Sequence, residues 1–510
     1  MKNAIRAQGG RVASAVYGAF AFLDRGNLKW RPAFVALRAC FVLFVTLSPS
    51  CTDDFADLNT NPNAPVDVAP ELLLRQVIYD HADHMSFEGF TGGANLGQYF
   101  SADPGFNRFD RGDLLAPQFG SNPWPRLYTQ LRDVGIVLAK ARTEERAAVY
   151  EGPALVLRSL IAGTLTDLFG DVPYVEAASG KDGAFAPGYD RQEDIYLGEG
   201  GILASLAEAV RVMDAYGGTF PLDGDELYGG DLEGWIRMAN SLRLRYLLRA
   251  SDELDAGRLA EMQAIVDEGR YVSEGSEDAV FRFGGAPNDF GFARARVGDF
   301  NNYLMSETVD GVLDALGDPR ERLWFRTTAA GEYNGLPHGL PSGYGTDTAS
   351  FPGLIWREGS AALKANFVTA WETSFVLAEA AARGFVSADG RELYERGVRQ
   401  AFAYWDTELP EDYLQRDGVR YGVFADGEVR EIATQRWLAS IGNGYEGWIE
   451  WRRTGFPRFG APVKSLNEGR WPIRFPYPVD EQALNTESYE AAVARLGGSN
   501  DVNAPVWWDE

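Results

Sequence analysis

The sequence contains little cysteine and little histidine: two cysteines and three histidines among 510 residues. Both cysteines, Cys40 and Cys51, lie near the N-terminus, and Cys40 lies within a segment that resembles a removable leader. If that leader is cleaved, Cys51 has no disulfide partner. The hydrophobic core alone must then stabilise the fold.

The three histidines do not support a metal site. His81, His84 and Glu88 are spaced i, i+3, i+7 on a predicted helix, so they could face one metal ion, but no nearby second segment clearly supplies another ligand. A solvated helix face with incidental histidines is the better interpretation. His338, in the loop 335–339, has no recognisable base or nucleophile partner. We therefore predict no metal and no cofactor.

Common catalytic motifs are also absent from the sequence. It has no Gly-x-Ser-x-Gly, no phosphate-binding loop and no dinucleotide fingerprint. A glycoside hydrolase needs two carboxylates about 5–9 Å apart across a cleft, and acidic residues are plentiful, but none lies in a distinctive motif. We predict no catalytic residue, and an all-α glycoside hydrolase acting on a polysaccharide at the cell surface is the alternative function.

Positive charge is scarce after the first fifty residues. Residues 1–50 carry seven basic side chains against Asp24 alone, a net charge of +6, so the whole-chain charge of −25 leaves about −31 for residues 51–510. Nucleic acid and anionic membrane surfaces both attract proteins through a positive field. The acidic excess argues against both as partners and is equally typical of a soluble acidic surface.

The apolar run at 39–47 is far shorter than the ~20 residues that span a bilayer. Basic residues precede it, the small residues Ser48 and Ser50 follow, and then come Cys51 and an acidic stretch. This order is typical of a bacterial lipoprotein signal, which predicts lipidation of Cys51. Three features depart from the usual lipoprotein signal. Leu47 lies four places before Cys51 instead of three, Pro49 is unusual in a cleavage site, and the leader of fifty residues is long. A start codon assigned too early explains the excess length. The alternative to lipidation is that Cys51 is an ordinary buried cysteine near the N-terminus.

Helical periodicity dominates after a tether rich in proline and asparagine at 51–70. The domains are thus a leader (1–50), the tether (51–70) and one large domain (71–510). We predict a mostly all-α fold, because no alternating strand pattern persists and no strict 34-residue repeat appears. The predicted helices are 71–85, 124–141, 145–169, 194–215, 233–250, 259–268, 301–316, 361–383, 390–405, 432–441 and 480–496, with long loops at 105–121, 179–192, 217–230, 284–298 and 329–359.

Seven segments together resemble the SusD/RagB family, in that family's order. They are 57–63 (DLNTNPN), 166–174 (TDLFGDVPY), 189–196 (YDRQEDIY), 239–245 (ANSLRLR), 377–384 (LAEAAARG), 450–457 (EWRRTGFP) and 506–509 (VWWD). The resemblance implies a SusD-like fold of degenerate tetratricopeptide-like helix pairs. It also implies a surface-exposed lipoprotein of the outer membrane that binds a nutrient, an oligosaccharide or a peptide, and delivers it to a SusC-like TonB-dependent transporter. Asp53-Asp54 after Cys51 resembles the surface-export signal of this lineage.

The polar residues of these segments are expected to be structural. We expect Asn240, Arg243 and Arg245 to satisfy buried carbonyls or carboxylates, and Glu379 to pair with one of those arginines. Arg452-Arg453 beside Trp451 could clamp a ligand, but a family-wide motif more often stabilises the scaffold.

The high aromatic content (13 Trp, 22 Tyr, 30 Phe) suits a surface that stacks on sugar rings, although a helical core rich in aromatics has the same composition. Two loop regions combine aromatic with polar side chains, and in the family the loops after the first helices and in mid-chain form the ligand site. The predicted ligand-binding residues are Phe106, Phe109, Trp324, Tyr333 and Trp356. For each of them, packing within a loop is the alternative role.

Overall fold

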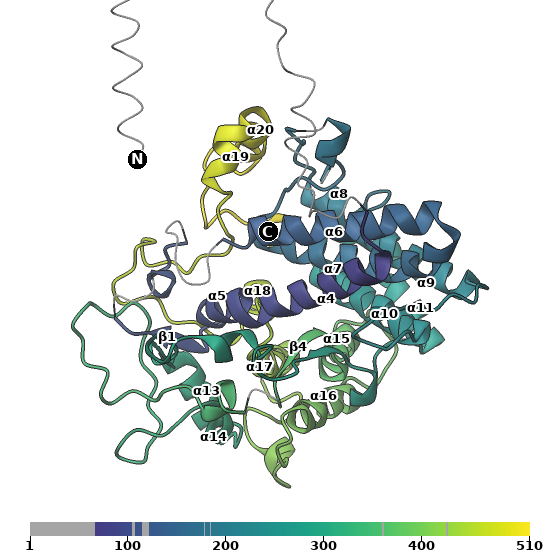
Figure 1. Ribbon diagram of the computed structural model, residues 1–510. Helices are drawn as coiled ribbons and strands as arrows, with labels where there is room; N and C mark the ends of the chain where they lie inside the picture. The colour runs from purple at the N-terminus through teal and green to yellow at the C-terminus, as the bar shows by residue number, and fades with distance from the viewer. Residues whose placement is uncertain are drawn as a thin grey trace, which may run out of the picture. The chain divides into compact units, whose positions relative to one another are not determined.

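The computed structural model describes residues 67–509 except 105–107, 115–121, 178, 184, 360–361 and 425–426. The predicted leader, nearly all of the tether, Cys51 and Phe106 lie outside this part. The described chain from Val68 onward forms one compact unit, and it is mostly helical, as predicted (Figure 1).

Twelve of the described helices have nine or more residues. They are α4 (Pro70–His84), α6 (Trp124–Thr143), α7 (Glu151–Phe169), α9 (Ile202–Ala215), α10 (Leu232–Arg249), α11 (Ala256–Glu268), α13 (Glu307–Leu316), α15 (Ala370–Ala382), α16 (Gly390–Tyr404), α17 (Val429–Ala439), α18 (Glu446–Thr454) and α20 (Thr486–Arg495). Shorter helices are α5 (Phe90–Leu96), α8 (Gln192–Leu197), α12 (Val297–Phe300), α14 (Glu321–Trp324) and α19 (Val479–Leu484). A π-helical turn, η1 (Met85–Gly89), joins α4 to α5.

Local sequence sets several of the helix ends. Ser306 begins α13 by accepting a hydrogen bond from the Val309 amide, and Gly317 ends it in the left-handed region. Asp255 and Gly269 do the same for α11. These are the signals from which a helix can be located without a tertiary structure.

Neighbouring helices pack in pairs, as expected for degenerate tetratricopeptide-like units. Helix α6 packs on α7, α7 on α9, α9 on α10, and α15 on α16. Helix α4 contacts α6 and α7 on one side and the strands β2 (Ala279–Arg282) and β4 (Lys364–Val368) on another (Figure 1). None of the described helices combines the length and the apolarity that a bilayer crossing requires.

Four predicted helices are broken in the structure. Residues 301–316 begin with strand β3 (Tyr303–Met305), which pairs antiparallel with β1 (Phe100–Ala102), and residues 361–383 begin with β4, which pairs with β2. These strands form because a distant segment supplies their backbone partners, which local periodicity does not reveal. Residues 194–215 divide at Gly198–Gly201, and residues 480–496 divide at Asn485.

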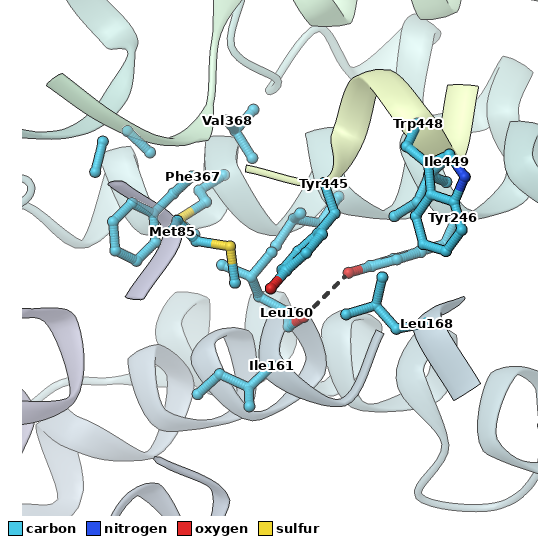
Figure 2. Close-up of a cluster of buried hydrophobic side chains, with 14 of the residues drawn as sticks. Met85, Leu160, Ile161, Leu168, Tyr246, Phe367, Val368, Tyr445, Trp448 and Ile449 are labelled. Atoms are coloured by element: carbon cyan, nitrogen blue, oxygen red, sulfur yellow. Dashed lines mark hydrogen bonds between the residues drawn. The ribbon is translucent and has the colours of Figure 1, made fainter. Parts of the chain in front are cut away.

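The core is one large cluster in which α7 is buried along most of its length. Figure 2 shows the Tyr246 hydroxyl of α10 pointing toward the Leu160 carbonyl of α7, to which it donates at 3.5 Å, with Tyr445 close by. A Cβ at Gly163 would lie 2.1 Å from Oη of Tyr246, so glycine is needed for α10 to approach this closely. A smaller cluster consists of Leu304 in β3 and three residues of the loop that follows α14, Leu336, Leu340 and Ala349.

Candidate functional site

Three of the predicted ligand-binding aromatics lie in the core. Phe109, Trp324 and Trp356 are each at most 1% exposed. Trp356 donates from Nε1 to the Trp324 carbonyl at 2.9 Å, and Phe109 packs edge-on against Phe475. An enclosed ring presents no face to a sugar, so in this structure these three side chains take the packing role that was the alternative. Of the four predicted residues that the structure describes, only Tyr333, which is half-buried in the loop 326–352, keeps partial access to solvent. Its ligand-binding role stays a prediction, as does that of Phe106.

A different set of aromatic residues lines an open groove of about 360 Å³. We call it the Trp451 groove. It is formed by the end of α18, the segment 459–473 that follows, and one residue from the C-terminal segment. Its lining residues are Trp451, Phe459, Gly460, Ala461, Gly469, Arg470, Trp471, Ile473 and Asn503. The volume is within the range of small-molecule sites.

A stacked aromatic pair forms one part of the groove. The rings of Trp451 and Phe459 have centroids 4.3 Å apart and planes 5° apart. Helix α18 ends at Gly455, whose φ of +71° reverses the chain so that Phe459 returns onto Trp451. Both rings are only partly buried, so this pair offers a flat apolar surface at the groove.

Another part of the groove contains Trp471, whose side chain is held by residues outside the groove lining. Its Nε1 donates to the Leu96 carbonyl at 2.7 Å, and its ring lies edge-on to His338 at 4.9 Å. His338 in turn donates from Nδ1 to Asp110 at 2.7 Å. The expectation that His338 lacks a partner is therefore wrong: the partner lies 228 residues away in the sequence.

The lining of the Trp451 groove includes no aspartate or glutamate among the described residues, and Arg470 is its one charged member. The two carboxylates of a glycosidase are therefore not part of this groove. A flat apolar ring surface suits the C–H face of a sugar, and Arg470 and Asn503 can hydrogen-bond to its hydroxyl edge. The arrangement is suited to binding.

The Arg452-Arg453 pair beside Trp451 belongs to the scaffold, as expected. Arg453 donates to Glu379 at 2.6 and 2.5 Å and to Glu450 at 2.8 Å, all three side chains being buried. Arg452 donates to Asp509 in the terminal VWWD segment and to the Asp167 carbonyl. These bonds join α15, α18 and the C-terminus.

One expected pairing within this scaffold is wrong. Glu379 was expected to meet Arg243 or Arg245, but it pairs with Arg453 and Arg383. Arg245 instead donates to Glu372 at 2.5 and 2.6 Å. Both carboxylates lie on α15 within seven residues of each other, and the packing of α10 against α15 decides which one Arg245 reaches.

The histidines of α4 are buried, which corrects the expectation of a solvated helix face. His81 donates from Nδ1 to Oε1 of Gln130 at 3.0 Å, and burial lowers its pKa to about 4. Burial also lowers the pKa of His84 well below its usual value. Glu88 pairs with Arg126 instead of joining them. No group of metal-ligating side chains occurs in the described part of the chain.

Sequence reasoning missed the Trp451 groove because Trp451 stood beside arginines with a structural role. A usable signal was present: Phe459 and Trp471 flank a segment rich in glycine and proline directly after Trp451. Such a segment must fold back as a loop, which can bring its aromatics together.

Comparison with known proteins supports the same fold. The profile of a SusD-like family, described as starch-binding and associating with the outer membrane, matches residues 62–478. No curated protein matches the chain significantly.

Several solved structures are similar to the described chain. One is a chitin-binding protein with 24% identity and a TM-score of 0.75, covering 86% of this chain and 100% of that chain. A SusD homologue from Bacteroides fragilis has 23% identity and a TM-score of 0.75, covering 87% and 100%. A chitin-binding SusD homologue from Flavobacterium johnsoniae has 21% identity and a TM-score of 0.74, covering 85% and 98%. At these identities the likeness establishes the fold.

Proposed function

The chain belongs to the SusD-like family of starch-binding proteins that associate with the outer membrane, and from this membership we propose that it captures an oligosaccharide at the cell surface. The observation that supports the proposal in this chain is the Trp451 groove, where the stacked rings of Trp451 and Phe459 lie beside Arg470 and Asn503. The chitin-binding proteins of similar fold favour a glycan over a peptide as ligand.

Binding can be tested directly by titrating the full-length protein in detergent with oligosaccharides in a calorimeter. Trp451→Ala removes half of the stacked pair and should weaken binding at least about 10-fold, because the apolar face of a sugar ring then loses the flat aromatic surface on which it packs. Tyr216→Ala, a half-buried aromatic at the end of α9 and not among the groove residues, is the matched control and should bind normally.

The titration also separates the alternatives. Binding of peptides with no response to any oligosaccharide would replace the glycan by a peptide as ligand. Release of shorter products from a labelled oligosaccharide would favour the all-α glycoside hydrolase instead. An unaltered ligand, bound and recovered intact, supports capture without chemistry.

The proposal includes a lipid anchor on Cys51, which places the protein on the outer membrane facing outward. Cys51→Ala should abolish labelling by a radioactive fatty acid and release the protein from the membrane fraction. A variant that stays lipid-labelled and membrane-bound would contradict the anchor. The groove and the fold do not depend on this result.

The proposal also includes delivery of the ligand to a SusC-like TonB-dependent transporter. Pull-down of the tagged protein from solubilised outer membranes should recover a large β-barrel protein in a stoichiometric amount. Recovery of the protein alone from membranes in which the transporter is present would contradict the partnership. Release to a transporter requires modest affinity, so we expect a Kd in the micromolar range or weaker, about −8 kcal/mol or less favourable.

A further inference from the structure

We propose that the ligand of the Trp451 groove is an anionic glycan, one whose sugars carry carboxylate or sulfate groups. The inference rests on the proposed function, because it names the class of glycan that this groove would take. It follows from the local charge of the groove, which is opposite in sign to that of the protein.

The segment that forms the groove is basic within an acidic chain. Residues 455–471 contain Arg458, Lys464 and Arg470 against the single acid Glu468. Over the whole chain, 73 acidic residues face 48 basic ones. The lining itself, in the described part of the chain, contains Arg470 and no carboxylate.

A fourth basic group joins this segment from another part of the chain. Arg111 donates from Nε to the Lys464 carbonyl at 2.7 Å, and the Leu466 amide donates back to the Arg111 carbonyl. Gly112, which follows, lies against Asn467, where a Cβ would be 3.0 Å away from its side chain. The turn η2 (Phe109–Arg111) therefore packs on the segment 464–470 and adds a guanidinium to the same region.

These basic groups are weakly neutralised within the protein. In the part of the chain that the structure describes, Arg111, Arg458 and Lys464 form no ion pair with a carboxylate; Arg458 lies over the Phe456 ring at 5.0 Å. Arg470 pairs with Glu468 at 3.1 Å, but the two side chains are 52% and 84% exposed. Such an exposed ion pair contributes little to stability, and a ligand anion can readily replace Glu468 as the partner of Arg470.

Two other surface arginines are held more firmly. Arg270 is shared between Asp214 and Glu233, and Arg416 donates twice to Asp412. Arg470 in the groove lining, and the basic groups on or against the segment that forms the groove, thus keep the capacity to bind an anion. Guanidinium matches carboxylate and sulfate through paired hydrogen bonds, while the Trp451–Phe459 surface remains available for the sugar ring.

Matched pairs of oligosaccharides test the inference with the full-length protein in detergent. One pair is oligogalacturonate and its methyl ester, which has the same chain without the charge. The other is a sulfated carrageenan oligosaccharide and its desulfated form. We expect at least about 10-fold tighter binding of one anionic member, with the advantage reduced between 50 and 500 mM NaCl because salt screens exposed charges. The pair that responds distinguishes carboxylate from sulfate.

Substitutions of the basic residues should change the ratio of the affinities for the anionic and neutral members. A variant that is merely unstable would weaken both affinities together. Arg470→Gln and Lys464→Gln should each reduce the preference for the anionic member about 3-fold or more. Lys464 is not among the lining residues of the groove, so Lys464→Gln should leave binding of the neutral member unchanged. Glu468→Gln should increase affinity for the anionic member, since it releases Arg470. The control is Arg146→Gln, an exposed arginine that lies over the Phe220 ring as Arg458 lies over Phe456.

Each outcome decides one of the two claims. Equal binding of charged and neutral members, lost in Trp451→Ala, would overturn this inference and leave the proposed function standing. Failure of all glycans to bind would overturn both, as would binding of acidic peptides alone. The anionic member could bind more tightly while Arg470→Gln, Lys464→Gln and Glu468→Gln leave this preference unchanged. That result would place the anion elsewhere on the protein and overturn the inference.

Discussion

Asp110 and His338 form a buried hydrogen-bonded pair, with 2.7 Å between the carboxylate Oδ1 and the ring Nδ1. The same carboxylate accepts hydrogen bonds from the Gly339 and Ala102 amides and from the Asn95 side chain. Asp110 therefore joins the nearby elements α5 and β1 to the loop residues His338 and Gly339, more than 220 positions away in the sequence. Because His338 packs against Trp471, the pair also supports one part of the Trp451 groove.

We predict that Asp110→Asn destabilises the protein by about 2–3 kcal/mol, because a neutral amide cannot accept from all four donors and hydrogen bonds to a charged group are the stronger ones. Urea denaturation at pH 7 measures the change. Asp417→Asn, at an exposed position, is the control. An unchanged midpoint for Asp110→Asn would show that the pair contributes nothing to stability.

Breaking the buried ion pair of Arg453 and Glu379 should destabilise the protein more than Asp110→Asn does. Arg453→Met leaves two buried carboxylates, on Glu379 and Glu450, with one fewer cationic partner, and removal of one member of a buried ion pair typically costs about 3–5 kcal/mol. Denaturation of Arg211→Gln, which breaks the exposed pair with Glu208, should be unchanged. If Arg453→Met and Arg211→Gln gave similar denaturation curves, a stabilising role of the buried ion pair would be contradicted.

Two buried tyrosines should respond differently to loss of the hydroxyl. Tyr99 donates to the Trp437 carbonyl, which also accepts from the Ser440 amide at 3.0 Å. Tyr99→Phe therefore removes one of two hydrogen bonds to this carbonyl and should cost about 0.5–1.5 kcal/mol. The Tyr445 hydroxyl has no hydrogen-bond partner in the described chain, and Tyr445→Phe should change stability by less than about 0.5 kcal/mol. Thermal or urea unfolding of the two variants side by side tests this contrast. A larger loss from Tyr445→Phe than from Tyr99→Phe would refute it.

The histidines of α4 should make the fold sensitive to mild acid. Burial lowers the pKa of His81 to about 4, against about 6.5 in the unfolded chain, so between these values the unfolded chain takes up a proton that the folded chain does not. This contribution is fully present above pH 6.5 and is lost as the pH falls toward 4. His84, whose pKa is also lowered, should add to the slope.

His84→Leu isolates this effect. Neither ring nitrogen of His84 has a hydrogen-bond partner in the described chain, so the variant should be as stable as wild type or more stable at pH 7. Its free energy of unfolding should fall less steeply between pH 6.5 and 4.5, as measured by urea denaturation at several pH values. Tyr445→Phe should keep the wild-type slope. An unchanged slope in His84→Leu would mean that His84 does not titrate on unfolding.

Much of the fold could be predicted because helices are local. Periodic apolar residues located α4, α6, α10 and α16 to within a few residues. The strands could not be found in this way. Phe100 in β1 pairs with Met305 in β3, and neither segment shows strand periodicity by itself over three residues.

The candidate site was harder to predict than the fold. Aromatic residues in loops were the right chemical type, but composition does not distinguish a ring that packs inward from one that faces solvent. Trp324 and Trp356 became core residues, whereas Trp451 and Phe459 formed an accessible stack. The difference depends on which other segments cover each ring.

The sequence by itself determined the helical class, the family and the acidic character of this protein, because periodicity, ordered motifs and charge are properties of neighbouring residues. Tertiary structure alone decided that His338 meets Asp110, that Arg453 rather than Arg245 pairs with Glu379, and that a basic, aromatic groove opens beside Trp451. These contacts join residues tens to hundreds of positions apart. Their formation depends on the packing of whole helices and loops, which no local pattern encodes.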